Sequence, residues 1–403
     1  MPGPVVANGA THTPDIAIVG GGPAGLSLAA ICEKNGISYI VYERGAKDAP
    51  PRGGCLDLHP NGGQIALKDA GDEIYKKWRS LARGGEASKH KVFDMQLNHV
   101  FDFSDEGDSP EAERYDLQQT LMMGIPDGKI HFHKKLETAE RDGEGKIVLK
   151  FSDGEIATGF KLVVGADGPF SKIRPLLTPM PVEYWGLVFM TGHIRQSNPF
   201  FPTLHAKASE GPMITMAPKT MIWCQRQGTG DYRIEWGILA DPEIGKTLPL
   251  DDNDAMIEFL LQDKYFGKHH PFIHDMLRNN DGGFRDWPLL QAPPEALNWE
   301  PHDDVTLIGD ACHATTPFIG EGANRAMKDA AMLARAVRKH GINKTAIAEY
   351  EAEMFPAAAD MIRWSDKSGR QIFQDDSPKS WVQFNVEARG GGGGGGEDSR
   401  PHG

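Results

Sequence analysis

The sequence has few cysteines and no pattern that would pair them. Its 403 residues include four cysteines, and no two of them form a C-x-x-C pair. This spacing favours reduced thiols over a disulfide framework, and it offers no zinc site. We therefore predict a protein of a reducing compartment, the cytoplasm, without a structural metal.

Basic runs and long apolar runs are also missing. The chain has 43 lysines and arginines against 56 aspartates and glutamates, a net charge of −13 at pH 7. Because this field repels polyanions, nucleic acids and anionic membranes are poor partners. No stretch reaches the roughly 20 apolar residues of a membrane span. The first 14 residues also lack the apolar region of a secretory signal.

The two ends of the chain are rich in residues that resist ordering. We predict disordered tails over residues 1–14 and 389–403, the second because it contains an unbroken run of seven glycines. Between the tails no segment of 20 to 50 residues repeats, which excludes solenoids and propellers. At roughly 100 to 200 residues per domain, the remaining length predicts two domains.

The first recognisable elements form one βαβ unit. A strand at 16–19, a glycine turn at 20–25, a helix at 26–35 and a strand at 39–42 follow one another. This order predicts a parallel sheet. Further strands are expected at 146–151, 161–164 and 305–308.

The middle and the end of the chain differ from this beginning. Between about residues 182 and 239, alternating segments are separated by Gly, Pro and Asn, which predicts an antiparallel sheet in a second domain. Its strands are expected at 187–194, 221–226 and 232–239. Helical patterns follow at 326–339, 346–355 and 357 to about 373. The fold class is therefore α/β, a Rossmann-type domain with an inserted antiparallel sheet and C-terminal helices.

The glycine turn satisfies G-x-G-x-x-G. A dinucleotide site needs a tight turn at Gly20, a bare backbone at Gly22 where a pyrophosphate approaches, and a small contact at Gly25. The following helix offers unpaired N–H groups to the phosphates. Glu43 ends the second strand 18 residues past Gly25, where a carboxylate can bind ribose hydroxyls. The sequence therefore predicts a dinucleotide site.

Two later strands also end in an aspartate. Asp167 follows one strand and Gly309-Asp310 follows another, at the strand ends where open α/β sheets bind ligands. The segment 317–324 then leads into a helix whose positive end suits a flavin ring that becomes anionic on reduction. These features favour FAD over NAD.

Three sets of residues carry a resemblance to a known family: Gly20-x-Gly22-x-x-Gly25, Asp167-Gly168 and Gly309-Asp310. The chain resembles, from about residue 15 to 384, the FAD-dependent aromatic hydroxylases typified by para-hydroxybenzoate hydroxylase, the class A flavoprotein monooxygenases. Within this family, residues 53–59 with Gly63-Gln64, and residues 114–117, look closest to the tetracycline-inactivating monooxygenases.

The resemblance implies noncovalent FAD, and NADPH as a transient reductant that needs no second Rossmann fold. It implies Glu43 on the adenosine ribose, Arg114 near the flavin or its phosphates, and Asp310 on the ribityl chain or pyrophosphate. The expected cofactor-binding residues are Gly20, Gly22, Pro23, Ala24, Gly25, Glu43, Arg44, Asp57, Arg114, Asp167, Gly309, Asp310, Pro317, Gly320, Gly322, Ala323 and Asn324.

The chain departs from the family pattern at several positions. Glu321 stands where relatives often carry glutamine, and a carboxylate there opposes an anionic reduced ring unless it faces away. Thr191, Pro212 and Glu235 occupy places where the family's tetracycline-binding polar groups are expected. We therefore do not expect tetracycline to be the natural substrate.

The resemblance implies a monomeric monooxygenase that uses NADPH and O₂. One oxygen atom would pass, through a flavin C4a-hydroperoxide, to a medium-sized aromatic or enolisable metabolite. A flavin dehydrogenase or reductase on the same scaffold and a non-catalytic flavin-binding sensor remain alternatives. A halogenase is disfavoured because its W-x-W-x-I-P signature is absent.

We expect the middle sheet to supply the substrate pocket, and apolar and aromatic residues in this sheet, such as Phe189, Met190 and Trp223, favour an aromatic or enolisable substrate. The apolar face of its strands, with Val188, Met190 and Ile194, should pack on a core. The two-residue period places Thr191 and Glu235 on the more polar strand faces, toward the flavin or toward water. A buried Glu235 would have a raised pKa and could accept a phenol proton, so Thr191 and Glu235 are the candidate catalytic residues.

Two histidines by the cofactor loops have a simpler interpretation. His59 and His313 lack a second histidine or carboxylate at metal spacing, so each is expected to form a hydrogen bond or to pack. The domains are expected to be an FAD-binding domain over 15–90, 113–180 and 285–340, a substrate domain over 91–112 and 181–284, and C-terminal helices over 341–388.

Overall fold

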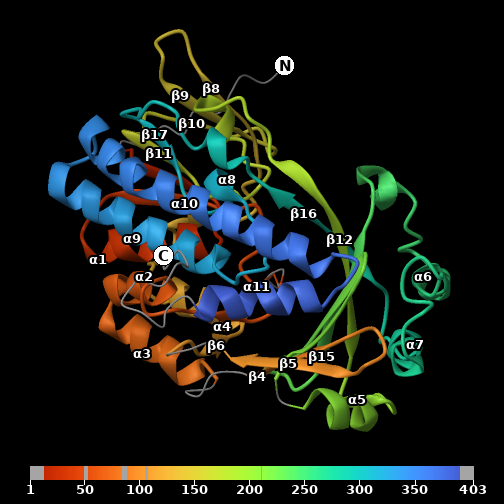
Figure 1. Ribbon diagram of the computed structural model, residues 1–403. Coiled ribbons are helices and arrows are strands. Elements are labelled where there is room, and N and C mark those ends of the chain that lie inside the picture. The colour runs from red at the N-terminus through yellow and green to blue at the C-terminus, as the bar shows by residue number, and fades with distance from the viewer. Residues whose placement is uncertain (1–12, 50–52, 84–88, 105–107, 210, 391–403) are drawn as a thin grey trace.

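The computed structural model describes residues 13–49, 53–83, 89–104, 108–209 and 211–390 (Figure 1). The predicted disordered tails, 1–14 and 389–403, lie outside these residues except for 13–14 and 389–390. The four cysteines are all unpaired. In the described part of the chain, no helix combines the length and the apolar character that crossing a membrane requires.

A five-stranded sheet forms the centre of the first domain. Its order is β17-β11-β1-β2-β7, and every neighbouring pair is parallel, as predicted. Its strands are β1 (Ile16–Val19), β2 (Tyr39–Tyr42), β7 (Ile130–His131), β11 (Leu162–Gly165) and β17 (Val305–Leu307). Every residue of β1 and β11 is buried, as expected for parallel strands covered on both faces.

Helices and small sheets surround this parallel sheet. Buried residues of β1, α1, α2 and α9 share one apolar core. The helices of this domain are α1 (Pro23–Lys34), α2 (Gly63–Ala70), α3 (Asp72–Leu81), α4 (Arg114–Met122), α8 (Asp310–His313) and α9 (Gly322–His340). The small sheets pair β3 (Leu56–Asp57) with β6 (Glu111–Ala112), and β8 (Leu136–Arg141), β9 (Ile147–Phe151) and β10 (Ile156–Thr158) with one another.

A seven-stranded sheet of order β16-β12-β15-β14-β13-β4-β5 dominates the second domain. Its strands are β4 (Lys89–Phe93), β5 (His99–Ser104), β12 (Glu183–Ile194), β13 (Met213–Ala217), β14 (Thr220–Arg226), β15 (Tyr232–Leu239) and β16 (Arg285–Gln291). The strands predicted at 187–194, 221–226 and 232–239 pair antiparallel, as β12, β14 and β15, whereas β4 and β13 run parallel.

This sheet also extends past the predicted domain boundary at residue 284. β16 pairs with β12 at the edge of the sheet, although we expected residues from 285 onward in the cofactor domain. Pro288 lies within β16. Proline has no N–H group to donate to a neighbouring strand, but it is tolerated on an edge strand. A proline within a segment argues against a strand, and we predicted no strand here.

The two faces of the seven-stranded sheet have different neighbours. On one face Val188, Met190, Ile234 and Trp236 are buried in an apolar core. This core includes residues of α5 (Phe201–Ala208), α6 (Asn253–Leu260) and α7 (Pro271–Arg278), which Figure 1 shows on the side away from the cofactor domain. The opposite face therefore points toward the cofactor domain and the C-terminal helices.

The C-terminal helices cross between the two domains in Figure 1. We predicted two helices at 346–355 and 357–373, but one continuous helix, α10 (Lys344–Ile372), contains Pro356. Its buried residues keep a three-to-four-residue spacing across the proline, as in Tyr350, Met354, Ala358 and Met361, so packing offsets the lost backbone bond. α11 (Lys379–Gly390) follows it.

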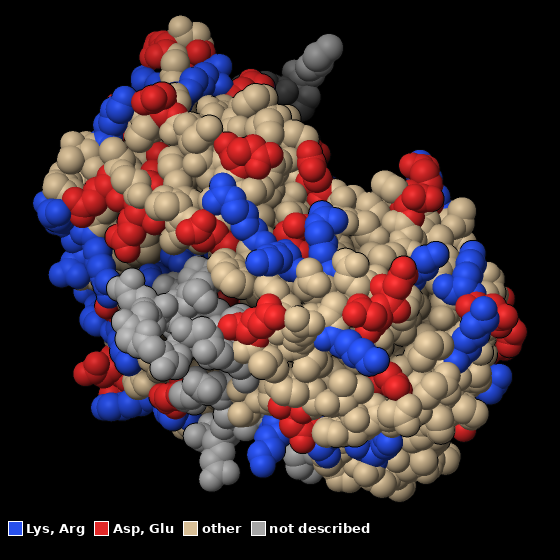
Figure 2. Space-filling view, in the orientation of Figure 1, with Lys and Arg blue, Asp and Glu red and all other residues tan. Residues whose placement is uncertain are grey.

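The remaining helical turns are short. They are the 3₁₀ helices η1 (Arg174–Leu176), η2 (Pro242–Lys246) and η3 (Pro294–Ala296). The helix predicted to follow the acidic run at 251–254 is α6, and Asp252 caps it by accepting a hydrogen bond from the Ala255 N–H at 3.0 Å. On the face shown in Figure 2, acidic and basic side chains are interspersed over the surface.

Candidate active site

The glycine turn has the geometry that a dinucleotide requires. A Cβ on Gly20 would lie 2.1 Å from the Ala166 carbonyl oxygen, and a Cβ on Gly25 would lie 2.0 Å from the Gly20 carbonyl oxygen. These two glycines therefore let the turn close and α1 pack. A Cβ on Gly22 would meet no atom within 4 Å, so open space lies beside this backbone. Pro23 begins α1, whose first N–H groups face the turn. The turn fits a pyrophosphate.

Glu43 lies beside the turn at the end of β2. Its carboxylate accepts hydrogen bonds from the Gly21 N–H and the Gly45 N–H, each at 2.6 Å. Each carboxylate oxygen keeps further lone pairs, so these bonds orient Glu43 and leave acceptors for ribose hydroxyls. Arg44 follows with an exposed side chain.

Asp167 organises the turn that follows β11. Its Oδ2 accepts a hydrogen bond from the Lys172 N–H at 2.7 Å, while its Oδ1 is buried without a protein partner. Burial raises the pKa of this carboxyl, against hydrogen bonds from Ser171 and the backbone. Asp167 therefore supports the shape of the turn and also holds a spare acceptor.

Asp310 and Arg114 come together from distant parts of the chain. Asp310 is exposed to solvent on one side. The surrounding protein desolvates its carboxyl and raises the pKa of this group, while the charges of His313 and Arg114 lower it. Burial lowers the pKa of Arg114, and the charge of Asp310 opposes this shift. The Arg114 Nε is buried without a protein partner. A buried cationic N–H group without a protein partner is suited to donate a hydrogen bond to an acceptor group of a bound cofactor.

A buried histidine and a buried aspartate support the Gly309-Asp310 turn from behind. The Asp329 Oδ2 lies 2.5 Å from the His313 Nε2 and accepts a hydrogen bond from the Gly309 N–H at 2.9 Å. The side chains of His313 and Asp329 are both 0% exposed. This pair holds the left-handed backbone of Gly309, φ +61°, and through it the position of Asp310.

The segment 317–324 and the start of α9 form the next wall of the site. Asn324 is buried, and its Oδ1 accepts hydrogen bonds from the N–H groups of His59 at 2.8 Å and Gly63 at 2.9 Å. Its Nδ2 donates to the Asp57 carbonyl oxygen at 2.8 Å. The Asn324 side chain therefore joins the loop after β3 to α9, and any contact to a cofactor would come from its backbone.

The polar face of the seven-stranded sheet carries a three-residue cluster. The Thr191 hydroxyl donates to the Glu235 Oε2 at 2.7 Å, and the Arg233 Nε donates to the Glu235 Oε1 at 2.6 Å. The Arg233 guanidinium also donates to the Thr191 Oγ1 at 3.2 Å. Glu235 is 8% exposed, so this face does not simply meet water. Burial raises the pKa of Glu235, and Arg233 and Thr191 oppose the shift.

The same cluster adjoins the cofactor residues. A Cβ on Gly53 would lie 2.5 Å from the Arg114 Nε, and a Cβ on Gly54 would lie 3.5 Å from the Arg233 Cδ. The charges of Arg114 and Arg233 also influence each other. The Gly53-Gly54 loop therefore lies against both arginines and brings the sheet cluster to the edge of the cofactor site.

Aromatic rings lie on this face of the sheet. Phe189 packs against Trp287 of β16, with ring centroids 5.8 Å apart, and Trp223 meets the His90 ring at 5.6 Å. Met190 lies on the opposite face with Val188, in the core beneath α6 and α7, as the two-residue period of β12 predicts.

Comparison with known proteins identifies the chemistry. Residues 13–59 and 298–365 match the FAD binding domain family. Monooxygenase asqM of Emericella nidulans is 27% identical over 391 residues, which cover 84% of this chain and 87% of the relative. The structure of Klebsiella pneumoniae HpxO with FAD and uric acid superimposes with a TM-score of 0.71 at 21% identity, over 92% of each chain. The sequence and the fold are those of an FAD-dependent monooxygenase.

The subgroup of this monooxygenase is less sharply marked. The tetracycline destructase Tet(51) has the same fold, with a TM-score of 0.65 and 21% identity over 93% of this chain and 97% of that chain. This likeness is similar in degree to that of HpxO. The predicted family is therefore confirmed, and the proximity to the tetracycline-inactivating enzymes stays a prediction.

The monooxygenase also contains residues that the sequence did not single out. Asp329 was missed because it lies 16 residues from its partner His313, within an ordinary helical pattern. His59 and Glu321 were each noted in the sequence, but their contact, across 262 positions of the chain, was not predicted. Among the described residues, no three His, Cys, Asp or Glu side chains gather as metal ligands would.

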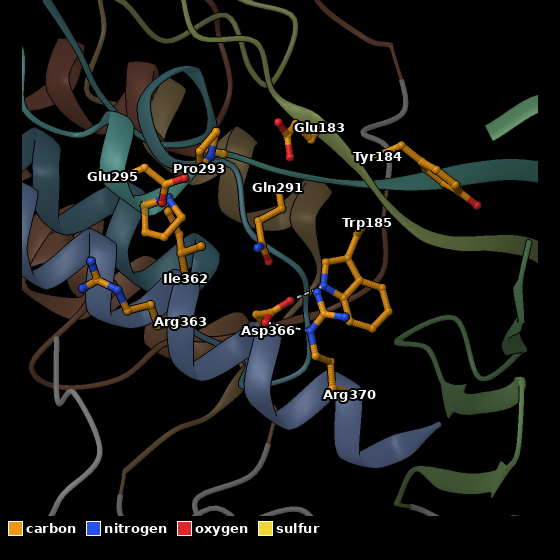
Figure 3. Close-up of a pocket in the computed structure, with 12 residues that line it drawn as sticks. Glu183, Tyr184, Trp185, Gln291, Pro293, Glu295, Ile362, Arg363, Asp366 and Arg370 are labelled. Carbon is orange, nitrogen blue, oxygen red and sulfur yellow. Dashed lines mark hydrogen bonds and ion pairs between the residues drawn. The ribbon is translucent and has the colours of Figure 1, made fainter. Parts of the chain in front are cut away.

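A surface pocket of about 280 Å³ lies between the start of β12, the end of β16 and α10 (Figure 3). Its lining includes none of the predicted cofactor or catalytic residues. Asp366 accepts hydrogen bonds there from the Trp185 Nε1 at 2.8 Å and the Arg370 Nε at 2.9 Å. Trp185 also packs against Phe318 at 5.1 Å, so the wall of this pocket supports the segment 317–324.

Proposed function

We propose that this monooxygenase uses NADPH and O₂ to insert one oxygen atom into a medium-sized aromatic or enolisable metabolite. The observation that carries the proposal is the contact of the Gly53-Gly54 loop with both Arg114 and Arg233. It puts the polar cluster of the sheet next to the residues that fit FAD.

Several residues would hold the cofactor, which supplies the redox and oxygen chemistry when it is bound. The backbone at Gly22 and the start of α1 would take the pyrophosphate, and Glu43 the ribose. Asp310 and Arg114 would lie along the ribityl chain and the ring. The positive end of α9 would face the part of the ring that gains negative charge.

Thr191, Arg233 and Glu235 would orient the substrate. A hydroxylated aromatic ring placed by Phe189 and Trp287 would present its hydroxyl to Glu235. Because burial raises the Glu235 pKa while Arg233 keeps its charge paired, this carboxylate is suited to accept a proton. Removing the phenol proton makes the ring more electron-rich, and it then reacts more readily with an electrophilic oxygen.

Substitution of Glu235 tests this role. Glu235→Gln keeps the size of the side chain but cannot accept the proton. We expect substrate hydroxylation to fall about 10²-fold to 10⁴-fold, with the remaining activity rising at high pH where phenols ionise unaided. FAD content and NADPH-driven flavin reduction should change little.

The matched control is Glu183→Gln, an exposed carboxylate on β12, the strand that pairs with the strand of Glu235. It should leave hydroxylation unchanged. Wild-type turnover in Glu235→Gln would remove Glu235 from the mechanism. NADPH oxidation that proceeds at full rate without oxygen transfer to any phenol in the wild-type enzyme would contradict the proposed function itself.

A further inference from the structure

Glu321 and His59 form a contact that the function described above does not use. The Glu321 Oε1 lies 3.0 Å from the His59 Nδ1, and the two side chains are 20% and 21% exposed. Glu321 is the residue immediately before α9, and His59 follows β3 and Leu58. The pair therefore bridges the start of α9 and the loop beside it.

At its position in the chain, Glu321 would ordinarily bind the first N–H groups of α9 rather than a histidine. It occupies the N-cap of α9, where a carboxylate ordinarily accepts hydrogen bonds from the first N–H groups of the helix. In this structure its side chain makes no capping hydrogen bond. The carboxylate is instead turned to His59.

Asn324 fixes the backbone of His59 in this arrangement. It accepts hydrogen bonds from the His59 N–H and the Gly63 N–H, and it donates to the Asp57 carbonyl oxygen. Asn324 lies three residues after Glu321, so these bonds hold the His59 backbone against the start of α9. The imidazole thus meets the carboxylate because of a rigid local framework rather than a flexible surface encounter.

The charge of Glu321 has consequences for a flavin at this helix end. A carboxylate on the N-cap would occupy N–H donors and cancel part of the positive end of α9. Both effects disfavour a ring that becomes anionic on reduction. Withdrawing and pairing the carboxylate preserves the donors and the positive potential.

We propose that His59 holds Glu321 away from the helix end and thereby raises the reduction potential of the bound flavin. The proposal rests on the placement of the flavin along 317–324 given under the proposed function. His59 is a positioning residue in this account, because it acts on the flavin through Glu321 and the N–H groups of α9.

The test is the two-electron midpoint potential of the FAD-loaded full chain, measured by spectroelectrochemistry. His59→Asn should free Glu321 to cap the helix and shift the reduction equilibrium about tenfold toward oxidised flavin, about 30 mV. Glu321→Gln should shift it toward reduced flavin. Glu321→Asp keeps the charge but is too short to reach His59, so it should act like His59→Asn.

The decisive comparison is the double variant. If His59 acts through Glu321, His59→Asn should have almost no effect on the potential in the Glu321→Gln background. An equal effect of His59→Asn in both backgrounds would overturn the proposal, and so would unchanged potentials in all the variants.

A similar pair at the far end of α9 provides the control. The His340 Nε2 lies 2.7 Å from the Glu349 Oε2, and His340 is about 28 Å along the helix from Glu321 at 1.5 Å per residue. His340→Asn and Glu349→Gln should leave the potential unchanged, and a shift as large as that of His59→Asn would also overturn the proposal. For a variant that loses FAD during purification, the ratio of the dissociation constants of oxidised and reduced FAD reports the same quantity.

The outcome is separate from that of the proposed function. The potential is measured without substrate, NADPH or O₂. Unmoved potentials in an active monooxygenase would therefore reject this inference alone, while shifted potentials in an enzyme that transfers no oxygen would reject the proposed function alone.

Discussion

The buried carboxylate of Glu351 makes stability depend on pH. Its Oε1 accepts hydrogen bonds from the Trp299 Nε1 at 3.0 Å and the Thr306 Oγ1 at 2.8 Å, and its Oε2 is buried without a partner. Glu351 is 0% exposed, and burial raises its pKa from 4.5 to about 7. Thr306 lies on β17, the strand that ends at the Gly309-Asp310 turn.

The size of the effect follows from linkage. Because the folded pKa is the higher one, Glu351 stabilises the protein at low pH, and this contribution is lost as pH rises from about 4.5 through about 7. A difference of 1 between the folded and unfolded pKa values corresponds to about 1.4 kcal/mol. Between pH 5 and pH 8 the free energy of unfolding should therefore fall by about 2 to 3 kcal/mol through this group.

The perturbation is Glu351→Gln, which keeps an acceptor for Trp299 and Thr306 and removes the ionisation. Urea unfolding of the FAD-saturated protein at pH 5 to 8 measures the free energy of unfolding. The difference between the variant and the wild type should grow by about 2 to 3 kcal/mol in favour of the variant across this range. Glu353→Gln, an exposed carboxylate on the same helix, is the control. Parallel curves for the wild type and Glu351→Gln would refute the reasoning.

Four further substitutions test the cofactor site and its surroundings. Gly22→Val should retain the fold but lose FAD, because its side chain enters open space that the pyrophosphate needs. Gly20→Val should unfold the domain, because its Cβ would clash with the Ala166 carbonyl oxygen. Circular dichroism reports the fold and flavin absorbance reports the FAD content. Asp329→Asn should weaken FAD binding about 10-fold to 100-fold in a fluorescence titration, since it weakens the charged acceptor of the Gly309 N–H, and unchanged affinity would count against this support. Gly369→Ala should cost about 1 to 3 kcal/mol in thermal unfolding, because its Cβ would lie 2.3 Å from an aromatic ring of the segment 317–324; an unchanged melting temperature would show that this ring is free to move.

Local patterns in the sequence were sufficient to predict the cofactor domain. The turn at 20–25, the strands β1 and β2 and the two aspartates at strand ends each depend on neighbouring residues or on a run of apolar residues. The structure also brings Asp310 close enough to Arg114 for their charges to interact. Short-range rules and a specific motif therefore predict the shape of the turns, and the roles of their residues toward FAD stay predictions.

Contacts between distant segments could not be predicted in the same way. Glu235 is held by Arg233 and Thr191, and only the pairing of β12 with β15 decides that Thr191 lies opposite Glu235. The partners of His59 and His313 are carboxylates just before α9 and within α9, at positions where charged residues are ordinarily exposed. Pro288 and Pro356 are residues that ordinarily interrupt a strand or a helix. In the structure β16 and α10 each continue through their proline because tertiary packing stabilises them.

Oxygen transfer is the central claim, and turnover under oxygen-18 tests it most directly. The purified FAD-loaded chain is supplied with NADPH, labelled O₂ and a panel of phenols and enolisable compounds, and the products are analysed by mass spectrometry. The account predicts a product that carries one oxygen-18 atom for each NADPH oxidised. Unlabelled products, with all of the consumed O₂ recovered as hydrogen peroxide, would contradict it.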